Sequence, residues 1–386
     1  MSRRPGTPRL LRQLNDRAAL ELLLSSGPLT RAELGELTGL SKVTAGQLLA
    51  RLEERRLVAM VGEQAGGRGP NAALYGVVPS CAYVAGLDVL PDRICAGVAD
   101  ITGETVAEVA VDPSGHDDPV RLVRGAVQKA CETAGITLDL LRAFVIGTRG
   151  VVDPRTGDVR FSFDLPSWHE GVLAQLRRDL NVPVTIENDV NLAALAERFC
   201  GAALEVEDFV LVWAGVGQGL GVMLGGRLHR GFTGGAGEIG WLPVPGEPLP
   251  TEVTEPQSGS FQRLVGGDAL ASLADAHGIQ GHSLADHVHR AVMGDAGGFL
   301  DELAGRLAVG VAAVAVVLDP GLIVLSGDIG RAGGQVLAAR VEEAVARVCP
   351  SQPRVVVSEV EGNSVLRGAL VSALSQAREQ VFSETV

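Results

Sequence analysis

The apolar residues near the start of the chain recur at the spacing of amphipathic helices. The first such stretch, residues 9–24, is closed by the turn-forming residues 25–28. Thr30 and Glu33 have the spacing of a capping box, which predicts a second, short helix that ends at Gly39. The apolar face expected for the first helix contains Leu10, Leu11, Leu14, Ala18, Leu22 and Leu23.

A third helix is expected to begin after Ser41, a candidate N-cap, and to run to about Arg56. Two apolar stretches follow at residues 57–61 and 72–75, and a glycine-rich segment joins them. Two short helices with a tight glycine-containing turn, followed by a strand pair, are typical of a winged helix-turn-helix. We therefore expect residues 1–79 to form a DNA-binding domain.

The third helix would carry the DNA-reading side chains of such a domain. Arg51, further along this helix, is expected to reach the DNA backbone, and Arg68, in the glycine-rich segment, to reach a minor groove. The alternative is that the domain binds protein and that these side chains only solvate its surface. The residues expected to contact base edges lie outside the apolar face of the helix and are Ser41, Lys42, Thr44 and Gln47.

Beyond residue 80 the pattern changes to apolar runs of strand length, which alternate with helical segments. Strands are expected at residues 82–89, 93–99 and 105–111. A second strand-rich opening comes at residues 209–213, and the glycine-rich residues 215–221 lead from it into a further strand at 222–224. Two such openings in one chain indicate a duplicated α/β fold.

Charge is divided unevenly between the two parts of the chain. Residues 1–79 contain eleven Lys and Arg against seven Asp and Glu, a balance of +4. The remainder contains 22 against 39, a balance of −17, so that the whole chain has a net charge of −13. Because an acidic surface repels phosphates, only the amino-terminal part is suited to contact nucleic acid.

The composition, 46 % hydrophobic and 20 % charged over 386 residues, is that of a globular chain with two or three domains. The apolar run at residues 307–318 is far shorter than the ~18 residues of a membrane span, and no apolar signal core follows the first arginines. We therefore expect a cytoplasmic location without membrane contact. Five cysteines without a C-x-x-C pair argue against a disulfide framework and a thiolate zinc site.

Six segments of the body, in order, carry motifs of one known family: Gly86-Leu87-Asp88 and residues 147–154, 165–168, 187–194, 225–240 and 319–327. Together they resemble the ROK family of repressors and sugar kinases, in its repressor branch. The resemblance implies a winged helix-turn-helix followed by a two-lobed, actin-like (ribonuclease H-like) sugar-kinase fold. Residues 80–386 would then form the α/β domain that binds an effector and forms oligomers.

The resemblance also shows where this chain departs from the kinases of the family. The kinases bind ATP phosphates with glycine-rich turns, the first of which reads Asp-x-Gly-Gly-Thr. The second turn, in residues 215–221, keeps its glycines but has Val216 in place of threonine, and Asp328 adds a carboxylate near a third. We expect no ATP binding, no kinase activity and no cofactor. The residues that follow Asp88 in the first turn are bulky, lack an N–H group or are acidic: Val89, Leu90, Pro91 and Asp92.

The sugar side of the cleft matches the family more closely. Asn188 and Asp189 match the sugar-contacting pair, in which the aspartate is the general base of the kinases. Without ATP, Asp189 would contact a ligand and catalyse nothing. Glu238 matches a sugar-binding carboxylate, and the backbone of Gly150 would line the same cleft. Asn188 and Asp189 also have the position of an N-cap for the helix expected at residues 190–198.

Family members often carry a zinc site beside the sugar, made by one histidine and three cysteines. Trp241 replaces the histidine in this chain, and it would either stack on a sugar face or fill core space. Gln262 stands at the position of a sugar-binding glutamate, and Asp164 replaces an asparagine; both would line the cleft. We expect no zinc. The residues at the cysteine positions are Val253, Glu255 and Ser260.

These patterns together predict a transcriptional regulator of repressor type. Its partners would be a near-palindromic operator DNA and a carbohydrate effector that it does not phosphorylate, and it would be a homodimer or homotetramer. Two alternatives stay open at this point. One is an active ATP-dependent sugar kinase with an added DNA-binding domain, and the other is a DNA-binding protein whose altered cleft binds no ligand.

Overall fold

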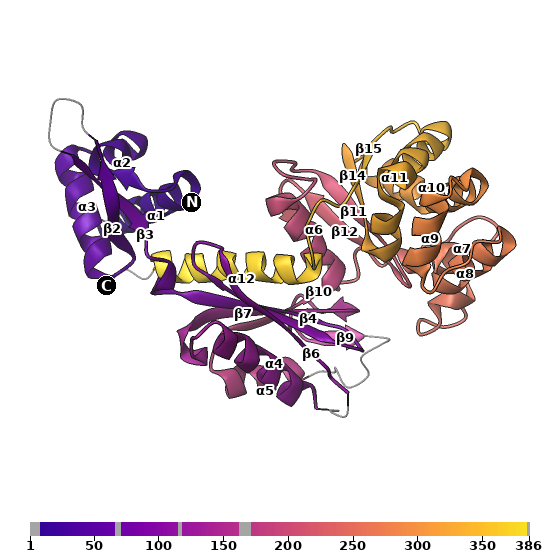
Figure 1. The fold of residues 1–386 in the computed structure, drawn as a ribbon, viewed down its shortest axis with the longest axis horizontal. Helices are drawn as coiled ribbons and strands as arrows, with labels where there is room; N and C mark the ends of the chain where they lie inside the picture. Colours follow the sequence, from indigo (N-terminus) through magenta and orange to yellow (C-terminus); the bar gives the residue numbers. More distant parts are fainter. Residues whose placement is uncertain (1–7, 66–70, 115–117, 162–170, 384–386) are drawn as a thin grey trace, which may run out of the picture.

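The computed structural model describes residues 8–65, 71–114, 118–161 and 171–383. Figure 1 shows three parts in a row. We call them the head (residues 8–79), lobe I (residues 80–188) and lobe II (residues 201–362). Two helices join the parts: α6 (Asp189–Cys200) lies between the lobes, and α12 (Ser364–Ser383) runs from the lobe junction to the head.

The head is a winged helix-turn-helix, as the sequence predicts. Its strands form one sheet in the order β1-β3-β2. The Thr30–Glu33 capping box is present, and Ser41 caps the third helix by accepting a hydrogen bond from the Thr44 N–H at 3.2 Å. The elements of the head are α1 (Pro8–Ser26), β1 (Leu29–Thr30), α2 (Arg31–Thr38), α3 (Lys42–Glu54), β2 (Val58–Gln64) and β3 (Ala72–Val77).

The expected apolar face of α1 is wrong in its first half. Leu10, Leu11 and Leu14 are 46–55 % exposed. The buried positions come later in the helix and include a charged one. They are Asp16, Ala19, Leu20 and Leu23.

The two lobes repeat one strand topology, which confirms the expected duplication. The sheet order is β10-β7-β4-β5-β6 in lobe I and β15-β14-β11-β12-β13 in lobe II, with the first two adjacent pairs parallel and the other two antiparallel in each. The lobe I strands are β4 (Tyr83–Val89), β5 (Ile94–Asp100), β6 (Thr105–Val111), β7 (Leu141–Thr148) and β10 (Val184–Asn188). Those of lobe II are β11 (Phe209–Ala214), β12 (Gln218–Leu224), β13 (Arg227–Leu228), β14 (Leu322–Ser326) and β15 (Arg354–Val357).

Helices cover these sheets, and short elements connect them. A small hairpin, β8 (Val151–Val152) and β9 (Val159–Phe161), follows β7. None of the helices in the described part of the chain combines the length and apolarity of a membrane crossing. The other helices are η1 (Pro79–Cys81), α4 (Pro119–Thr133), η2 (Leu138–Leu140), α5 (Val172–Leu180), η3 (Ile239–Trp241), η4 (Pro256–Ser258), α7 (Ser260–Val265), α8 (Gly267–Ala276), α9 (Leu284–Met293), α10 (Gly297–Leu318) and α11 (Gly327–Val348).

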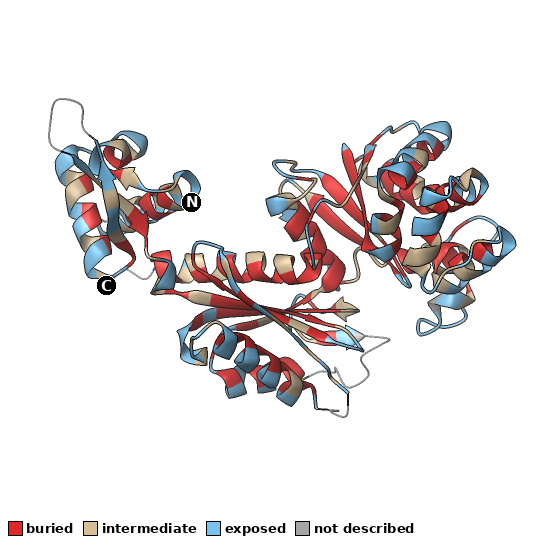
Figure 2. Cartoon of the chain, viewed as in Figure 1, coloured by how far each residue is buried: buried red, intermediate tan, exposed pale blue. Residues whose placement is uncertain are grey.

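One hydrophobic core continues from the head into lobe I through α12 (Figure 2). It contains Leu48 and Leu52 of α3, Val84 of β4, and Ala377 and Phe382 of α12. The Arg55 guanidinium also donates a hydrogen bond to the Val381 carbonyl at 2.9 Å. The boundary expected at residue 79 therefore separates two segments of sequence, whereas the end of the chain packs against both.

Candidate functional site

The carboxyl ends of three parallel strands of lobe I form the edge on which the candidate ligand site lies. The register aligns Asp88 of β4 and Glu187 of β10 with Gly147 of β7 between them. Asn188 is one residue further along the same edge. Ligands of open α/β sheets bind beyond such strand ends, and the residues that the sequence motifs select lie at this edge.

Asn188 is the N-cap of α6, so the capping interpretation of this residue is confirmed. Its Oδ1 accepts from the Asn191 N–H at 3.0 Å, and its Nδ2 donates to the Gly150 carbonyl at 3.1 Å. Gly150 has φ of 100°, a conformation that favours glycine. The Asn188 side chain thus holds the turn after β7 against the start of α6.

Asp189, the next residue, is a nearly buried carboxyl. It is 9 % exposed, and its Oδ1 accepts a hydrogen bond from the Val190 N–H at 2.9 Å. Burial, with the nearby Asp88 carboxyl as a second cause, raises the pKa of Asp189 to about 7, against the opposing charge of Arg149. Asp189 is therefore partly protonated near neutral pH and can both donate and accept hydrogen bonds.

Two further carboxyls belong to this site. Asp88 is 3 % exposed, and its Oδ2 accepts from Asn363 Nδ2 at 2.8 Å; burial raises the pKa of Asp88 as well. Burial raises the pKa of Glu238, from lobe II, to about 7. The three carboxyls share one low-dielectric region, and hydroxyl groups of a ligand would supply the donors that they need.

A loop of lobe II, residues 229–237, crosses to lobe I just before Glu238. Arg230 Nε pairs with Glu187 Oε2 at 2.6 Å, and the Arg155 guanidinium lies 5.7 Å from the centre of the Phe232 ring. The Arg230–Glu187 pair was not expected from the sequence. The two residues lie 43 positions apart, and no local pattern links them.

Gln262, a predicted ligand contact, braces the glycine-rich turn of lobe II. Its Nε2 donates to the Val216 carbonyl at 2.8 Å, and its Oε1 accepts from the Gln218 N–H at 3.2 Å. Each end of the amide thus has one partner within the protein. Trp241 ends η3 and is half-buried, which favours neither of its two expected roles. Asp164 lies outside the described residues.

The two turns expected at the ATP phosphates occupy equivalent places in the two lobes. In the first, the Leu90 N–H donates to the Arg93 carbonyl at 2.9 Å and closes a tight turn around Pro91. In the second, β12 begins at Gln218, four residues earlier than expected, and therefore includes two of the four glycines of this turn. A Cβ at Gly219 would lie 2.7 Å from Val190 Cγ2, so this glycine serves the packing of β12 on α6.

The candidate DNA-contacting residues lie at the start of α3. Ser41, Lys42 and Gln47 are exposed, whereas Thr44 is half-buried, with its hydroxyl 2.9 Å from the Ser41 hydroxyl. Arg68 lies outside the described residues.

Arg51, predicted to reach the DNA backbone, forms an ion pair within the head. Its Nη2 pairs with Asp16 Oδ1 at 2.6 Å, and the Asp16 side chain is only 1 % exposed. The arginine therefore neutralises a buried carboxylate of α1 and holds α1 and α3 together.

The described residues contain no group of three or more His, Cys, Asp or Glu side chains that could hold a metal ion. The lobe junction offers a ligand carboxyl groups that form hydrogen bonds. Such a site is suited to a small polyhydroxyl molecule.

The fold and these two sites define a protein with a winged helix-turn-helix head on a two-lobed body of the sugar-kinase type. The chain belongs to the ROK family, whose family profile matches residues 84–376. A MarR family profile matches residues 13–69, within the head.

Individual relatives agree with this assignment. The chain is 27 % identical to a xylose repressor of Caldicellulosiruptor bescii over 61 % of this chain and 60 % of that protein. It is 26 % identical to the transcriptional dual regulator NagC of Escherichia coli over 63 % and 60 % of the two chains. The matches thus span about three-fifths of these curated relatives.

Solved structures are similar over more of the chain. A ROK transcriptional regulator, described as a homologue of the Escherichia coli MLC protein, aligns with a TM-score of 0.76 over 97 % of this chain and 100 % of that one, at 18 % identity. A ROK hexokinase from Thermus thermophilus aligns with a TM-score of 0.62 over 77 % and 99 % of the two chains, at 27 % identity. The first match establishes the fold of head and body together.

Proposed function

We propose that the chain is a cytoplasmic transcriptional regulator of repressor type, which binds a near-palindromic operator as a homodimer or homotetramer. The observation that carries this proposal is the open start of α3. Lys42 and Gln47 are exposed there on a Ser41-capped helix, and this helix belongs to a head fused to a ROK body. The names of the xylose repressor and of NagC support the same function.

Genome-wide mapping of bound sites tests this function. The full chain should enrich a small set of loci that share a near-palindromic sequence, and a Lys42→Ala variant should lose most of that enrichment. Enrichment that is the same for both proteins, or no enrichment, would contradict the function.

We infer that the body binds a carbohydrate effector without phosphorylating it. The closed turn at Leu90 and Pro91 supports the lack of kinase activity, because it offers no glycine backbone to phosphates. Three carboxyls support sugar binding, because Asp88 and Asp189 are buried, Glu238 is half-buried, and each has a raised pKa and can hydrogen-bond ligand hydroxyl groups. A ligand that binds only the folded chain raises its melting temperature, so a thermal-shift screen of sugars tests this inference.

The similarity to a hexokinase, together with the retained Asp189, makes a sugar kinase the second candidate function. An assay of ATP consumption with glucose, xylose and N-acetylglucosamine distinguishes the two. Our proposal predicts no turnover above background. Turnover that disappears in Asp189→Asn would establish the kinase instead, and no thermal shift with any sugar would favour a DNA-binding protein without a ligand.

We propose that the two helices between the parts, α6 and α12, carry the effect of the ligand to the head. At the cleft, α6 begins with Asp189, and Asn363 just before α12 bonds to Asp88. The two helices cross in backbone contact, since a Cβ at Gly368 would overlap the Leu192 carbonyl. At its other end α12 packs into the core of the head.

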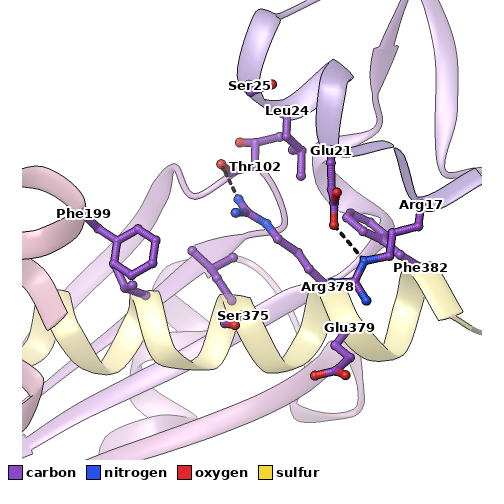
Figure 3. Close-up of a pocket in the computed structure, with 12 residues that line it drawn as sticks. Arg17, Glu21, Leu24, Ser25, Thr102, Phe199, Ser375, Arg378, Glu379 and Phe382 are labelled. Atoms are coloured by element: carbon purple, nitrogen blue, oxygen red, sulfur yellow. Dashed lines mark hydrogen bonds and ion pairs between the residues drawn. The ribbon is translucent and has the colours of Figure 1, made fainter. Parts of the chain in front are cut away.

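A pocket of about 420 Å³ lies where these helices meet the head (Figure 3). Residues of the head, lobe I and both helices line it, and they include Leu24 of α1, Thr102, Phe199 at the end of α6, and Leu374 of α12. On one side Arg378 Nη2 donates to the Thr102 carbonyl at 2.9 Å. The pocket is open to solvent on one side, so we infer that the head can shift against the body here.

Phe199 tests this coupling. It is 56 % exposed and lines the pocket, whereas Leu204, which is 59 % exposed, does not. With the sugar found by thermal shift, Phe199→Ala should reduce the change in DNA affinity caused by that sugar and keep the sugar affinity itself. Leu204→Ala should change neither. Equal sugar responses in Phe199→Ala and the wild type would contradict the coupling.

A further inference from the structure

Val43, the second residue of α3, is an apolar side chain in a polar setting. It is 71 % exposed, and its neighbours Lys42 and Gln47 are exposed as well. The packing of α3 in the head uses other positions, since the buried residues of this helix are Ala45, Leu48, Leu49 and Leu52. The isopropyl group of Val43 is therefore not needed for the core of the head.

Val43 lies in the first turn of α3, the recognition helix of the head. The first turns of the recognition helix are the part that enters the major groove in a helix-turn-helix, and Val43 is one turn before Gln47 on the same exposed face. A valine in a helix holds almost one rotamer, so little side-chain entropy is lost when a partner covers it.

A valine side chain neither donates nor accepts a hydrogen bond, so it cannot read the polar edge of a base. The apolar feature that the major groove offers is the 5-methyl group of thymine. We propose that Val43 is a specificity-determining residue that packs against the methyl group of one thymine in each operator half-site. This inference rests on the proposed DNA binding of the head.

The experiment begins with an operator duplex selected by the full chain from a randomised pool. Each thymine of one half-site is then replaced in turn by deoxyuridine, which lacks only the 5-methyl group. Fluorescence anisotropy at fixed salt measures the Kd of each duplex. One replacement should weaken binding by wild-type protein about fourfold, the effect expected for one buried methyl-sized group.

The matched variant is Val43→Ala. It should bind the thymine and deoxyuridine duplexes with the same Kd, so that the fourfold ratio falls to about one. Alanine is a strong helix former, so this exposed substitution preserves α3. Two controls should keep the wild-type ratio: Gln47→Ala, which weakens binding to both duplexes, and Val106→Ala on β6, an exposed valine of the body that changes neither Kd.

A thymine-to-deoxyuridine ratio that stays at fourfold in Val43→Ala would overturn the role of Val43, as would the lack of any sensitive thymine. These outcomes leave DNA binding by the full chain intact. If the pool yields no enriched duplex at all, the proposed function itself fails, and the two failures are thus distinguished.

Discussion

Two buried aspartates of this chain have opposite surroundings. Asp16 in the head is fully buried and pairs with Arg51 at 2.6 Å. Asp189 at the lobe junction is almost as deeply buried, yet its carboxyl accepts a hydrogen bond only from the neighbouring Val190 N–H among the described residues, and its pKa is raised to about 7. The first carboxylate is neutralised inside the protein, whereas the second is balanced only in part, by the charge of Arg149.

The difference in their partners distinguishes a structural carboxylate from a candidate ligand-binding carboxyl. A buried carboxylate with its own cation holds two helices together and has little left to offer a ligand. A buried carboxyl that lacks such a partner stores an electrostatic cost, which a ligand with hydroxyl donors reduces. By the same reasoning we propose a structural role for Arg51 and a ligand-contacting role for Asp189.

The largest expected effect comes from breaking the pair in the head. Asp16→Ala should reduce the stability of the head by about 3 kcal/mol, the low end of the range for a broken buried ion pair, because Arg51 is one-third exposed. Native-state hydrogen exchange at the amides of α3 measures this change. Glu21→Ala, which breaks the exposed Arg17–Glu21 pair, should cost less than about 1 kcal/mol. Equal losses in both variants would remove the distinction between the two aspartates.

The next effect separates Arg51 from a true DNA contact. Lys42→Ala should weaken operator binding by about 1–3 kcal/mol and leave stability unchanged, because its side chain is exposed. Arg51→Ala should do the opposite: it should destabilise the head and, under conditions where the variant is folded, bind the operator as the wild type does. Anisotropy and hydrogen exchange on both variants decide this, and a similar loss of DNA affinity in the two would return Arg51 to the DNA-contacting set.

The smallest effect concerns Asp189 and depends on pH. The folded state holds a proton on Asp189 and on Glu238 up to about pH 7, whereas the unfolded chain releases both near pH 4. Stability from these groups is therefore present at low pH and is lost as pH rises from about 4 to 7.

Asp189→Asn removes the contribution of Asp189 to this pH dependence of stability. It should stabilise the ligand-free chain by about 1 kcal/mol at pH 8 and by less at pH 5. Denaturant unfolding at the two pH values measures this gain, with Asp92→Asn on the exposed first turn as the control. A gain that does not depend on pH would show that the Asp189 carboxyl has its ordinary pKa.

Local patterns were sufficient to predict the head and the strand openings of both lobes. The capping box at Thr30 and Glu33, the N-cap at Ser41 and the strands before residues 90 and 215 depend on neighbours in the sequence, and all are present. Asp189 and Glu238 were predicted from the resemblance to the ROK family. No local pattern in the sequence indicates that these two residues lie close together.

The parts that could not be predicted depend on contacts between distant segments. Asp16 and Arg51 lie 35 positions apart, so nothing local marks Asp16 as buried. The brace between Gln262 and the turn at Val216 spans 46 positions, so no local pattern predicts it. The end of α12 packs against the head across almost the whole chain, and for this reason the domain boundary does not divide the core.

We propose that the body is a receptor whose ligand changes DNA binding without ATP. The direct measurement is a titration of the protein bound to a labelled, selected duplex with xylose, glucose and N-acetylglucosamine, in the absence of nucleotide. At least one sugar should change the anisotropy-derived Kd by about tenfold. Asp189→Ala, which leaves no hydrogen-bonding side-chain group at this position, should remove this response. A sugar response that requires ATP and is accompanied by release of ADP would contradict this receptor role.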